Sequence, residues 1–191
     1  LVISARTATR DINNNVVPET LPGCLREFAG VSVEEYGKLN KPGQRPFFLK
    51  FRDKKIKSEI WYEILNLENA SALAKWSGRH LDGKPAISIR SLGKGNVIYT
   101  GVYLTEKILK MLMPEFARIA DLKPVWPSAP RGVETVARYN GKKKIWFFIN
   151  HNDDKVTMKK TPVGENLIAG AKNSGNAIVL DRYEVAVIKE G

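Results

Sequence analysis

A β-hairpin pattern lies in the middle of the chain, over residues 84–104 (KPAISIRSLGKGNVIYTGVYL). Ile87 and Ile89 alternate with polar neighbours. In the second half, Val97 and Tyr99 alternate with Asn96, Ile98 and Thr100. Alternation with a period of two is typical of strands, because successive side chains point to opposite faces of a sheet. The Gly93-Lys94-Gly95 segment between them supplies the positive φ that a tight turn needs. The pattern predicts two strands in the middle of a sheet.

A helical pattern follows the hairpin at once. Thr105 suits the N-cap position, and Pro114 interrupts the pattern, which predicts a kink or two short helices. Apolar residues recur at helical spacing and form one stripe, which we expect to pack on the sheet. The stripe consists of Ile108, Leu109, Leu112, Met113, Phe116 and Ile119.

Shorter apolar runs precede the hairpin. Residues 1–5, 47–51 and 60–67 are predicted strands, and residues 22–30 are a short helix that ends at Gly30. Residues 70–76 are too short for periodicity to decide between helix and strand.

Residues 7–22 (TATRDINNNVVPETLP) are polar and rich in asparagine, which predicts an extended loop. Loops of this length in compact domains are usually functional, interface-forming or disordered.

The chain changes character at the proline-rich segment 124–130 (PVWPSAP). Short strand patterns separated by turn signals follow it, at residues 133–139, 144–149, 155–160 and 184–188, and they predict a small all-β sandwich or barrel. We therefore expect an α/β domain over residues 1–129 and an all-β domain without a long helix over residues 130–191. We expect residues 124–130 to run over the surface with few contacts to either side.

Composition places the chain among ordinary soluble globular proteins, with 43% hydrophobic and 27% charged residues in 191. No apolar run approaches the roughly 18 residues of a membrane span, and no signal peptide is visible, so a cytoplasmic location is favoured. Because Leu1 opens an apolar strand without a preceding Met, we expect the chain to be a piece of a longer protein.

The formal net charge of +11 invites a nucleic-acid interpretation. The lysines, however, are scattered over residues 50–57, 142–144 and 159–160, without one basic stripe or a known motif. Lysine in solvated turns and on edge strands, where it blocks edge-to-edge pairing, accounts for such a distribution. We therefore predict neither a nucleic-acid partner nor a membrane partner.

No catalytic, cofactor or metal constellation is visible in the sequence. Cys24 is the single cysteine and is expected to be a small buried residue, and His80 and His151 have no second ligand at metal-binding spacing. Glu34 and Glu35 are adjacent in a predicted strand and point apart, so they make a poor acid/base pair. The other carboxylates that could in principle pair are those of Glu63 and Glu68.

Three stretches, in order along the whole chain, closely resemble the glycoside hydrolase family 42 β-galactosidases. The first, residues 5–36, carries the family's Arg-Thr, Asp/Asn-loop, Leu-Pro-Gly and Gly-Val-x-Val-Glu-x-Tyr elements. The second has the Gly-Lys-Pro-Ala strand and Gly-Lys-Gly turn, at residues 83–86 and 93–95, with Tyr99. The third, residues 130–134 with 147–150, is similar to the start of the family's C-terminal domain.

The resemblance implies a three-domain enzyme: a (β/α)₈ barrel with two catalytic glutamates, a flavodoxin-like middle domain and a small antiparallel β domain. The middle domain, which also resembles class I glutamine amidotransferases, holds a trimer together and helps wall a neighbour's active site. This chain would be part of that middle domain followed by a β-sandwich. No catalytic glutamate can be carried over to it, and glycoside hydrolysis needs two carboxylates.

The resemblance thus implies a non-catalytic assembly part of a β-galactosidase, a homotrimer whose substrate is a β-galactoside, without a cofactor. A free-standing basic binding module for carbohydrate or nucleic acid is the alternative. Arg6, Asp11 and Asn14 are the residues expected at or near the trimer contact. Arg6 is the strongest candidate, because the planar guanidinium suits interfaces.

Overall fold

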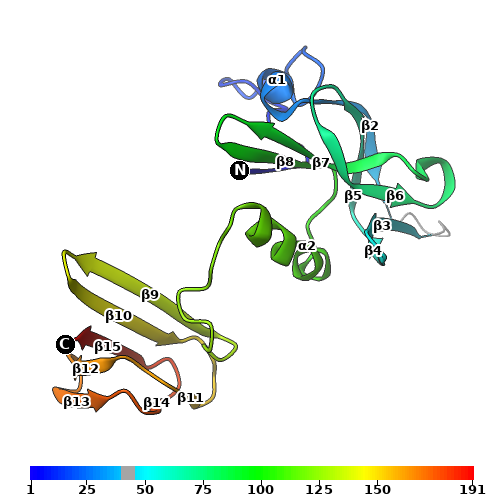
Figure 1. The fold of residues 1–191 in the computed structure, drawn as a ribbon. Helices are drawn as coiled ribbons and strands as arrows, with labels where there is room; N and C mark the ends of the chain where they lie inside the picture. The colour runs from blue at the N-terminus through cyan, green and yellow to red at the C-terminus, as the bar shows by residue number, and fades with distance from the viewer. Residues whose placement is uncertain (40–45) are drawn as a thin grey trace. The chain divides into compact units, whose positions relative to one another are not determined.

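The computed structural model describes residues 1–39 and 46–191, which form two compact units, Leu1–Leu122 and Lys123–Gly191 (Figure 1). Strands account for most of the regular structure that is described, and helices are few. Each unit has its own hydrophobic core. The two units are therefore described separately.

The first unit is built on a six-stranded sheet, in which the predicted hairpin occupies an interior position. The strand order is β1 (Val2–Ser4), β8 (Gly95–Thr100), β7 (Pro85–Leu92), β6 (Ser71–Ser77), β3 (Phe47–Phe51) and β4 (Lys54–Ser58). A separate two-stranded sheet pairs β2 (Val31–Lys38) with β5 (Trp61–Leu67). The strands predicted before the hairpin are confirmed, and the ambiguous residues 70–76 belong to a strand.

The hairpin strands are buried on both faces of the sheet. Ile98 belongs to one core cluster together with Ile87, whereas Val97 and Tyr99 belong to a second cluster on the opposite face. The turn follows the prediction, because Leu92 pairs with Gly95 and Gly93 has a φ of 57°.

The parallel content of this sheet is low. Among the described strands, β1 and β8 form a parallel pair, and the neighbouring pairs from β8 to β4 are antiparallel. The expected combination of strands and helices is present, but the flavodoxin-like topology, which is a parallel arrangement, is not confirmed.

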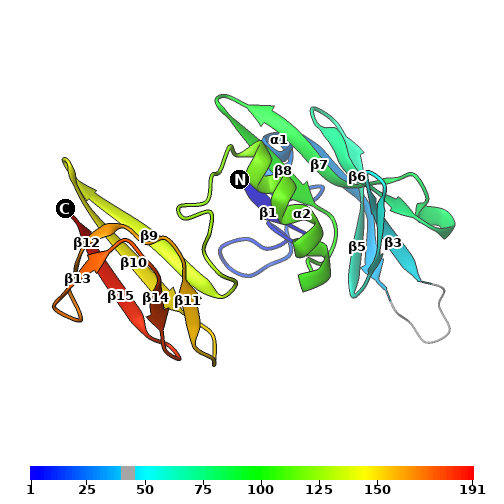
Figure 2. The same ribbon diagram turned by 60° about the horizontal axis from the view of Figure 1, so that its bottom comes forward.

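The helix α2 (Glu106–Ile119) covers one face of the sheet and contributes four side chains to the same core cluster as Ile87 and Ile98 (Figure 2). As predicted, Thr105 caps it, since the Thr105 hydroxyl accepts a hydrogen bond from the Ile108 N–H at 3.4 Å. The helix continues through Pro114, so of the two alternatives predicted there, two short helices is wrong, and a kink stays a prediction. The buried positions are Ile108, Met111, Leu112, Glu115 and Phe116.

The apolar stripe predicted for α2 is partly wrong. Met113 is 51% exposed, and Met111 takes the core position instead. Residues 108, 111, 112, 115 and 116 follow the i, i+3, i+4, i+7, i+8 spacing of one helical face, which places Glu115 at a core position that hydrophobicity does not reveal.

A short helical segment lies on the chain's return to β2. It consists of the 3₁₀ turn η1 (Gly23–Leu25) and α1 (Arg26–Ala29), and Gly30 ends it with a φ of 68°, as predicted. A side chain at Gly30 would also meet the Arg90 side chain at 2.9 Å. Cys24 is exposed rather than buried, because in η1 it is Gly23 that faces the interior.

The second unit is all-β, as predicted, in the part that the structure describes. A five-stranded antiparallel sheet has the order β13 (Ala171–Ser174), β12 (Val163–Asn166), β15 (Val185–Glu190), β10 (Lys143–Asn150) and β9 (Val133–Asn140). A two-stranded antiparallel sheet pairs β11 (Val156–Met158) with β14 (Ile178–Leu180). Both sheets contribute to one core, made of Trp146, Phe148, Met158, Leu180, Ala186 and Ile188.

The proline-rich segment 124–130 is attached to this second core. The ring of Trp126 lies edge-on to Trp146 at 4.9 Å between centroids, and Ala129 packs on the same cluster. The expectation of few contacts is wrong here, because an indole ring buries a large apolar area when it reaches apolar neighbours. The predicted domain boundary at 129/130 stays a prediction.

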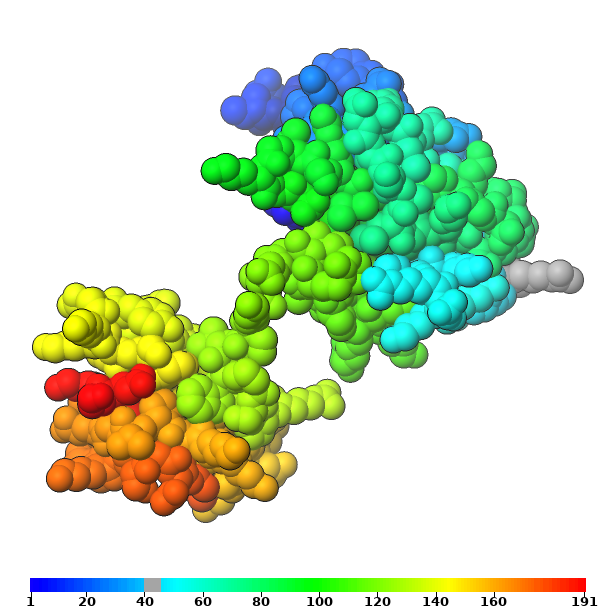
Figure 3. Space-filling view, in the orientation of Figure 1, coloured from blue at the N-terminus to red at the C-terminus, as the bar shows by residue number. Residues whose placement is uncertain are grey.

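Three lysines occupy one row across the first unit's sheet. Lys50 in β3 is directly opposite Lys55 in β4 and also directly opposite Lys75 in β6. All three are exposed, and β3 and β4 form part of the outer surface (cyan in Figure 3). Edge protection explains only Lys55, since β4 is an edge strand whereas β3 and β6 are internal.

Candidate functional site

A buried carboxylate lies beneath the start of the loop 7–22. Glu63 in β5 is only 1% exposed. Its Oε1 accepts hydrogen bonds from the Arg6 backbone N–H at 2.9 Å and from the Trp61 indole Nε1–H at 3.2 Å, and its Oε2 accepts one from the Tyr99 hydroxyl at 2.9 Å. Burial raises the pKa of the Glu63 carboxyl, while these hydrogen bonds act in the opposite direction. The carboxylate therefore ties β5 to the start of the loop and to β8.

An exposed stack of side chains stands on this anchor. The Arg6 guanidinium carbon lies 4.9 Å from the centre of the Trp61 ring, and the Tyr36 ring stacks on Trp61 at 5.5 Å with an angle of 22°. Tyr36 is 56% exposed, and Arg6 is exposed with a φ of 65°. Arginine, tryptophan and tyrosine are the residue types that dominate interface hot spots. We call Arg6, Trp61 and Tyr36 the aromatic stack.

The loop 7–22 is ordered by its own polar groups. The Asp11 Oδ1 accepts hydrogen bonds from the backbone N–H groups of Asn13 and Asn15, at 2.9 and 2.8 Å. The hydrogen bonds from Asn15 lower the pKa of Asp11. An isolated β-bridge joins Arg10 to Val16 below the tip. The expectation of a long non-helical loop is confirmed, and the loop has a defined internal structure.

The tip of this loop presents apolar side chains to solvent. Ile12 is 99% exposed and Val16 is 68% exposed. Single exposed apolar residues are common, but a nearly fully exposed isoleucine on an ordered tip has no intramolecular packing partner to explain it.

A cavity of about 380 Å³ lies at the base of the same loop. Its wall includes Val17, Leu21 and Val33 together with the aromatic stack. A second cavity, of about 410 Å³, shares Arg6 and Trp61 and is lined further by Lys38, Ile60 and Tyr103. The aromatic stack therefore borders two hollows in the surface.

The three residues predicted at a contact occupy two places in this arrangement. Arg6 lies at the base of the loop in the aromatic stack, whereas Asp11 and Asn14 lie at the tip. Asn14 has a φ of 64°, and its carbonyl accepts a hydrogen bond from the Arg10 guanidinium at 2.8 Å. Asp11 and Asn14 shape the tip through hydrogen bonds with Arg10, Asn13 and Asn15, away from Arg6 at the base.

Sequence reasoning missed the rest of the site. From the sequence, Tyr36 is only the end of a family motif, and Glu63 is only one of several carboxylates that could in principle pair. The available signal was the i, i+2 spacing of Trp61 and Glu63, which places both on one face of β5. Nothing in the sequence reveals that Tyr99 and Arg6 meet them there.

The other glutamates considered for acid/base chemistry each have a partner that is not a carboxylate. Glu34 pairs with Lys84 at 3.6 Å, Glu35 accepts a hydrogen bond from the Tyr62 hydroxyl, and Glu68 pairs with Arg26 at 2.6 Å. Across residues 1–39 and 46–191, no group of three or more His, Cys, Asp or Glu side chains could hold a metal ion. In the same residues, no helix is both long and apolar enough to cross a membrane.

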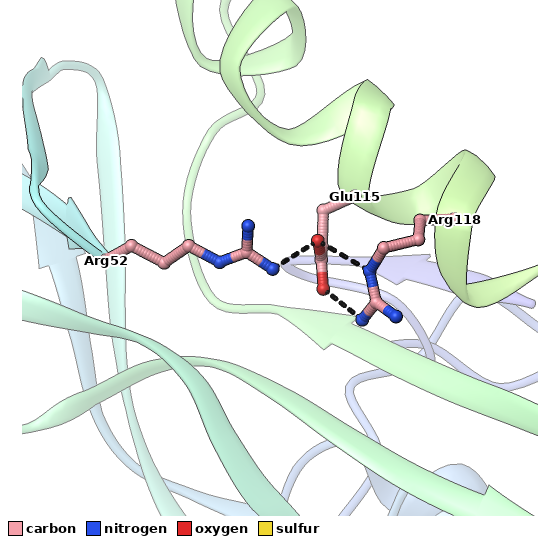
Figure 4. A network of polar contacts seen from close by, with 3 residues as sticks. All are labelled: Arg52, Glu115 and Arg118. Carbon is pink, nitrogen blue, oxygen red and sulfur yellow. Dashed lines mark hydrogen bonds and ion pairs between the residues drawn. The ribbon is translucent and has the colours of Figure 1, made fainter.

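A second polar cluster fixes α2 to the turn between β3 and β4 (Figure 4). The Glu115 Oε2 accepts hydrogen bonds from the Arg52 guanidinium at 2.6 Å and from the Arg118 Nε at 3.1 Å, and Arg118 also reaches Oε1 at 2.6 Å. The Glu115 side chain is 7% exposed, whereas the arginines are 63% and 67% exposed. Hydrogen bonding to Arg118 lowers the pKa of Glu115. Both carboxylate oxygens of Glu115 already accept hydrogen bonds, and we assign the cluster a structural role.

Comparison with protein families identifies both parts of the chain. Residues 1–123 match the family model described as the β-galactosidase trimerisation domain, and residues 132–190 match the β-galactosidase C-terminal domain. The chain belongs to glycoside hydrolase family 42. The matched models of this family do not include a catalytic barrel domain.

Curated family 42 relatives are β-galactosidases much longer than this chain. The chain is 35% identical over 143 residues to β-galactosidase LacZ of Heyndrickxia coagulans, covering 75% of this chain and 21% of that protein. It is 29% identical over 192 residues to β-galactosidase BgaB of Geobacillus sp. (strain Y412MC61), covering 100% of this chain and 28% of that protein. The chain thus spans between a fifth and a third of these relatives.

Solved structures share the fold over the whole chain. The β-galactosidase from Bacillus circulans sp. alkalophilus superposes with a TM-score of 0.81 at 22% identity, covering 100% of this chain and 29% of that chain. A catalytic mutant of Gan42B, a family 42 β-galactosidase from G. stearothermophilus, gives a TM-score of 0.80 at 20% identity, covering 99% of this chain and 27% of that chain.

Proposed function

We propose that this chain is a non-catalytic assembly part of a family 42 β-galactosidase, which holds a homotrimer together and helps wall a neighbour's active site. The single observation that carries the proposal is the match of residues 1–123 to the trimerisation domain. The exposed aromatic stack at Arg6 supports it, because its composition is that of an interface hot spot and its anchor is buried.

The finer assignments of fold and boundary are part of this proposal. Residues 1–129 would be a partial flavodoxin-like domain, for which the parallel β1–β8 pair and the covering helix α2 are the support. Residues 130–191 would be a β-sandwich, for which the support is a core shared by two antiparallel sheets.

The substrate of the whole protein is proposed to be a β-galactoside, as the names of the relatives indicate. The catalytic pair would lie outside this chain. Glu63 is a poor candidate for that chemistry, because both of its oxygens are occupied by donors and the side chain is buried.

The test is the mass of the chain in solution, measured by light scattering. The chain is expected to be a trimer, and Arg6→Asn with Tyr36→Ala is expected to shift it to monomers. Asparagine is chosen at position 6 because it tolerates a positive φ. The control is Arg182→Ala with Tyr183→Asn, which removes an exposed arginine and an exposed tyrosine that contact each other at 4.8 Å in the second unit. Asparagine is used again because Tyr183 has a φ of 56°.

Two results would contradict the proposal. A parent chain that stays monomeric at all concentrations would contradict the proposal that the chain holds a homotrimer together. A trimer that survives the Arg6 and Tyr36 changes would show that the aromatic stack is not the contact.

A further inference from the structure

We propose that Ile12 at the loop tip of one copy inserts into the 380 Å³ cavity at the base of the same loop in a second copy. The inference rests on the proposed assembly function and names the contact that would carry it. It starts from two features of one chain that have no partner within it: a 99% exposed aliphatic side chain and a hollow with an apolar wall.

The tip is built as a rigid knob. The Asp11 carboxylate accepts hydrogen bonds from the backbone N–H groups of Asn13 and Asn15, which follow Ile12, and the Arg10–Val16 bridge closes the base of the tip. A preordered segment loses little conformational entropy on binding. Burying the Ile12 side chain would therefore strengthen association by about tenfold or more, which is what the apolar area of an isoleucine is worth.

The cavity has the size and the lining to receive such a side chain. Its volume of about 380 Å³ lies in the range of pockets that enclose small ligands, so one branched aliphatic side chain fits. Val17, Leu21 and Val33 supply aliphatic contacts, and the rings of Trp61 and Tyr36 form the remainder of the apolar wall.

One pair of charges across the contact is complementary. Arg6 lines the cavity, and Asp11 precedes Ile12 on the incoming tip. Arg10 belongs to both surfaces, because it lines the cavity and its guanidinium also donates to the Asn14 carbonyl at the tip. The lining also contains Glu19 and Glu63, but the Glu63 oxygens already accept hydrogen bonds from three donors. An entering tip would bring the Asp11 carboxylate toward the exposed Arg6 guanidinium.

The match of residues 1–123 to a trimerisation domain favours a ring over a symmetric pair. The knob and the cavity adjoin each other, because Arg10 and Val16 form the base of the knob and also line the cavity. Each copy offers one knob and one cavity, and insertion of each knob into the next copy is a heterologous contact. Such contacts close into a cyclic assembly when the rotation between neighbours permits, and three copies would give the expected trimer.

Disulfide cross-linking tests the contact directly. In a Cys24→Ser background, which removes the exposed native thiol, one chain carries Ile12→Cys and another carries Thr20→Cys, since Thr20 is exposed and lines the cavity. Mixing the two under mild oxidation is expected to give a covalent dimer of the unlike chains. The chain carrying both changes is expected to give a closed covalent trimer. Thr157→Cys in place of Thr20→Cys is the matched control, because Thr157 is exposed in β11.

The outcomes separate this inference from the assembly function. A parent chain that is trimeric but gives no more Ile12–Thr20 cross-link than the Thr157 control would overturn the inference and leave the assembly function standing. A chain that stays monomeric would overturn both.

A substitution gives a second readout. Ile12→Asp is expected to weaken trimer association at least tenfold without changing the unfolding midpoint of the monomer, because the side chain is exposed in one copy. A trimer unaffected by Ile12→Asp would also contradict the inference.

Discussion

Glu63 combines a charge with a site that excludes water, and its protonation should therefore be linked to stability. Because burial raises its pKa, the folded state keeps the proton at pH values where the unfolded chain has lost it. The free energy of unfolding should then fall as pH rises from the ordinary glutamate pKa through the raised one, and stay lower above it.

Glu63→Gln should remove this pH dependence and keep the structure. The amide oxygen can accept from Arg6 and Trp61, while its NH₂ donates to the Tyr99 oxygen. Urea unfolding of parent and variant across pH is expected to show the variant gaining relative stability as pH rises. Glu68→Gln is the control with the opposite sign, because hydrogen bonding to Arg26 lowers the pKa of Glu68. A difference between parent and Glu63→Gln that does not change with pH would contradict this account.

At the level of residues, the sequence revealed candidates but not their neighbours. Arg6 is visible in a motif, and the structure places it on Trp61, a residue 55 positions away in the sequence numbering. Such a meeting depends on how β1 and β5 are placed in the fold, which local pattern does not encode. The prediction that Cys24 is buried was wrong for a similar reason, because only the path of η1 decides which residue faces inward.

Elements are held together by few strong polar contacts, of which the Glu115 cluster is the clearest. Two exposed arginines share one buried carboxylate, so either arginine can satisfy it when the other is lost. Arg52→Ala and Arg118→Ala are each expected to cost under about 1 kcal/mol. The double variant should exceed the sum by about 1 kcal/mol or more, because it leaves the carboxylate buried without a partner.

Adding Glu115→Gln to the double variant should recover part of that excess, since the orphaned charge is then gone. The measurement is the free energy of unfolding of all four arginine combinations in urea. Strictly additive losses would mean that Glu115 is hydrated when the arginines are removed, and that the cluster does not tie α2 to the β3–β4 turn.

Most elements could be predicted because their patterns are strong and local. The hairpin at Gly93 and the cap at Thr105 follow from turn and capping chemistry, and both are present. The errors arose where tertiary packing overrides the local rule. Pro114 stays within α2, and Trp126 leaves its proline-rich surroundings to pack against Trp146.

At the scale of the whole molecule, the sequence established the family but not the topology of the sheet. The expected division into α/β and all-β parts follows from the strand and helix patterns on either side of residues 124–130, and the family matches cover both parts. The antiparallel pairing of β8 with β7 and β7 with β6 could not be inferred from a resemblance that implied a flavodoxin-like sheet.

The row of Lys50, Lys55 and Lys75 gives the first unit a stability that depends on ionic strength. Neighbouring strands are about 4.8 Å apart, so the three ammonium groups repel one another at short range. Sodium chloride shortens the Debye length from about 10 Å at 0.1 M to about 3 Å at 1 M, and should raise the unfolding midpoint.

Lys50→Gln should raise that midpoint at low salt and reduce its response to salt, whereas Lys142→Gln, with the same change in net charge, should do so less. Equal effects of the two substitutions would assign the response to the overall charge of +11. The repulsion among these three lysines destabilises the sheet, and an anionic group bound at this face would reduce that repulsion.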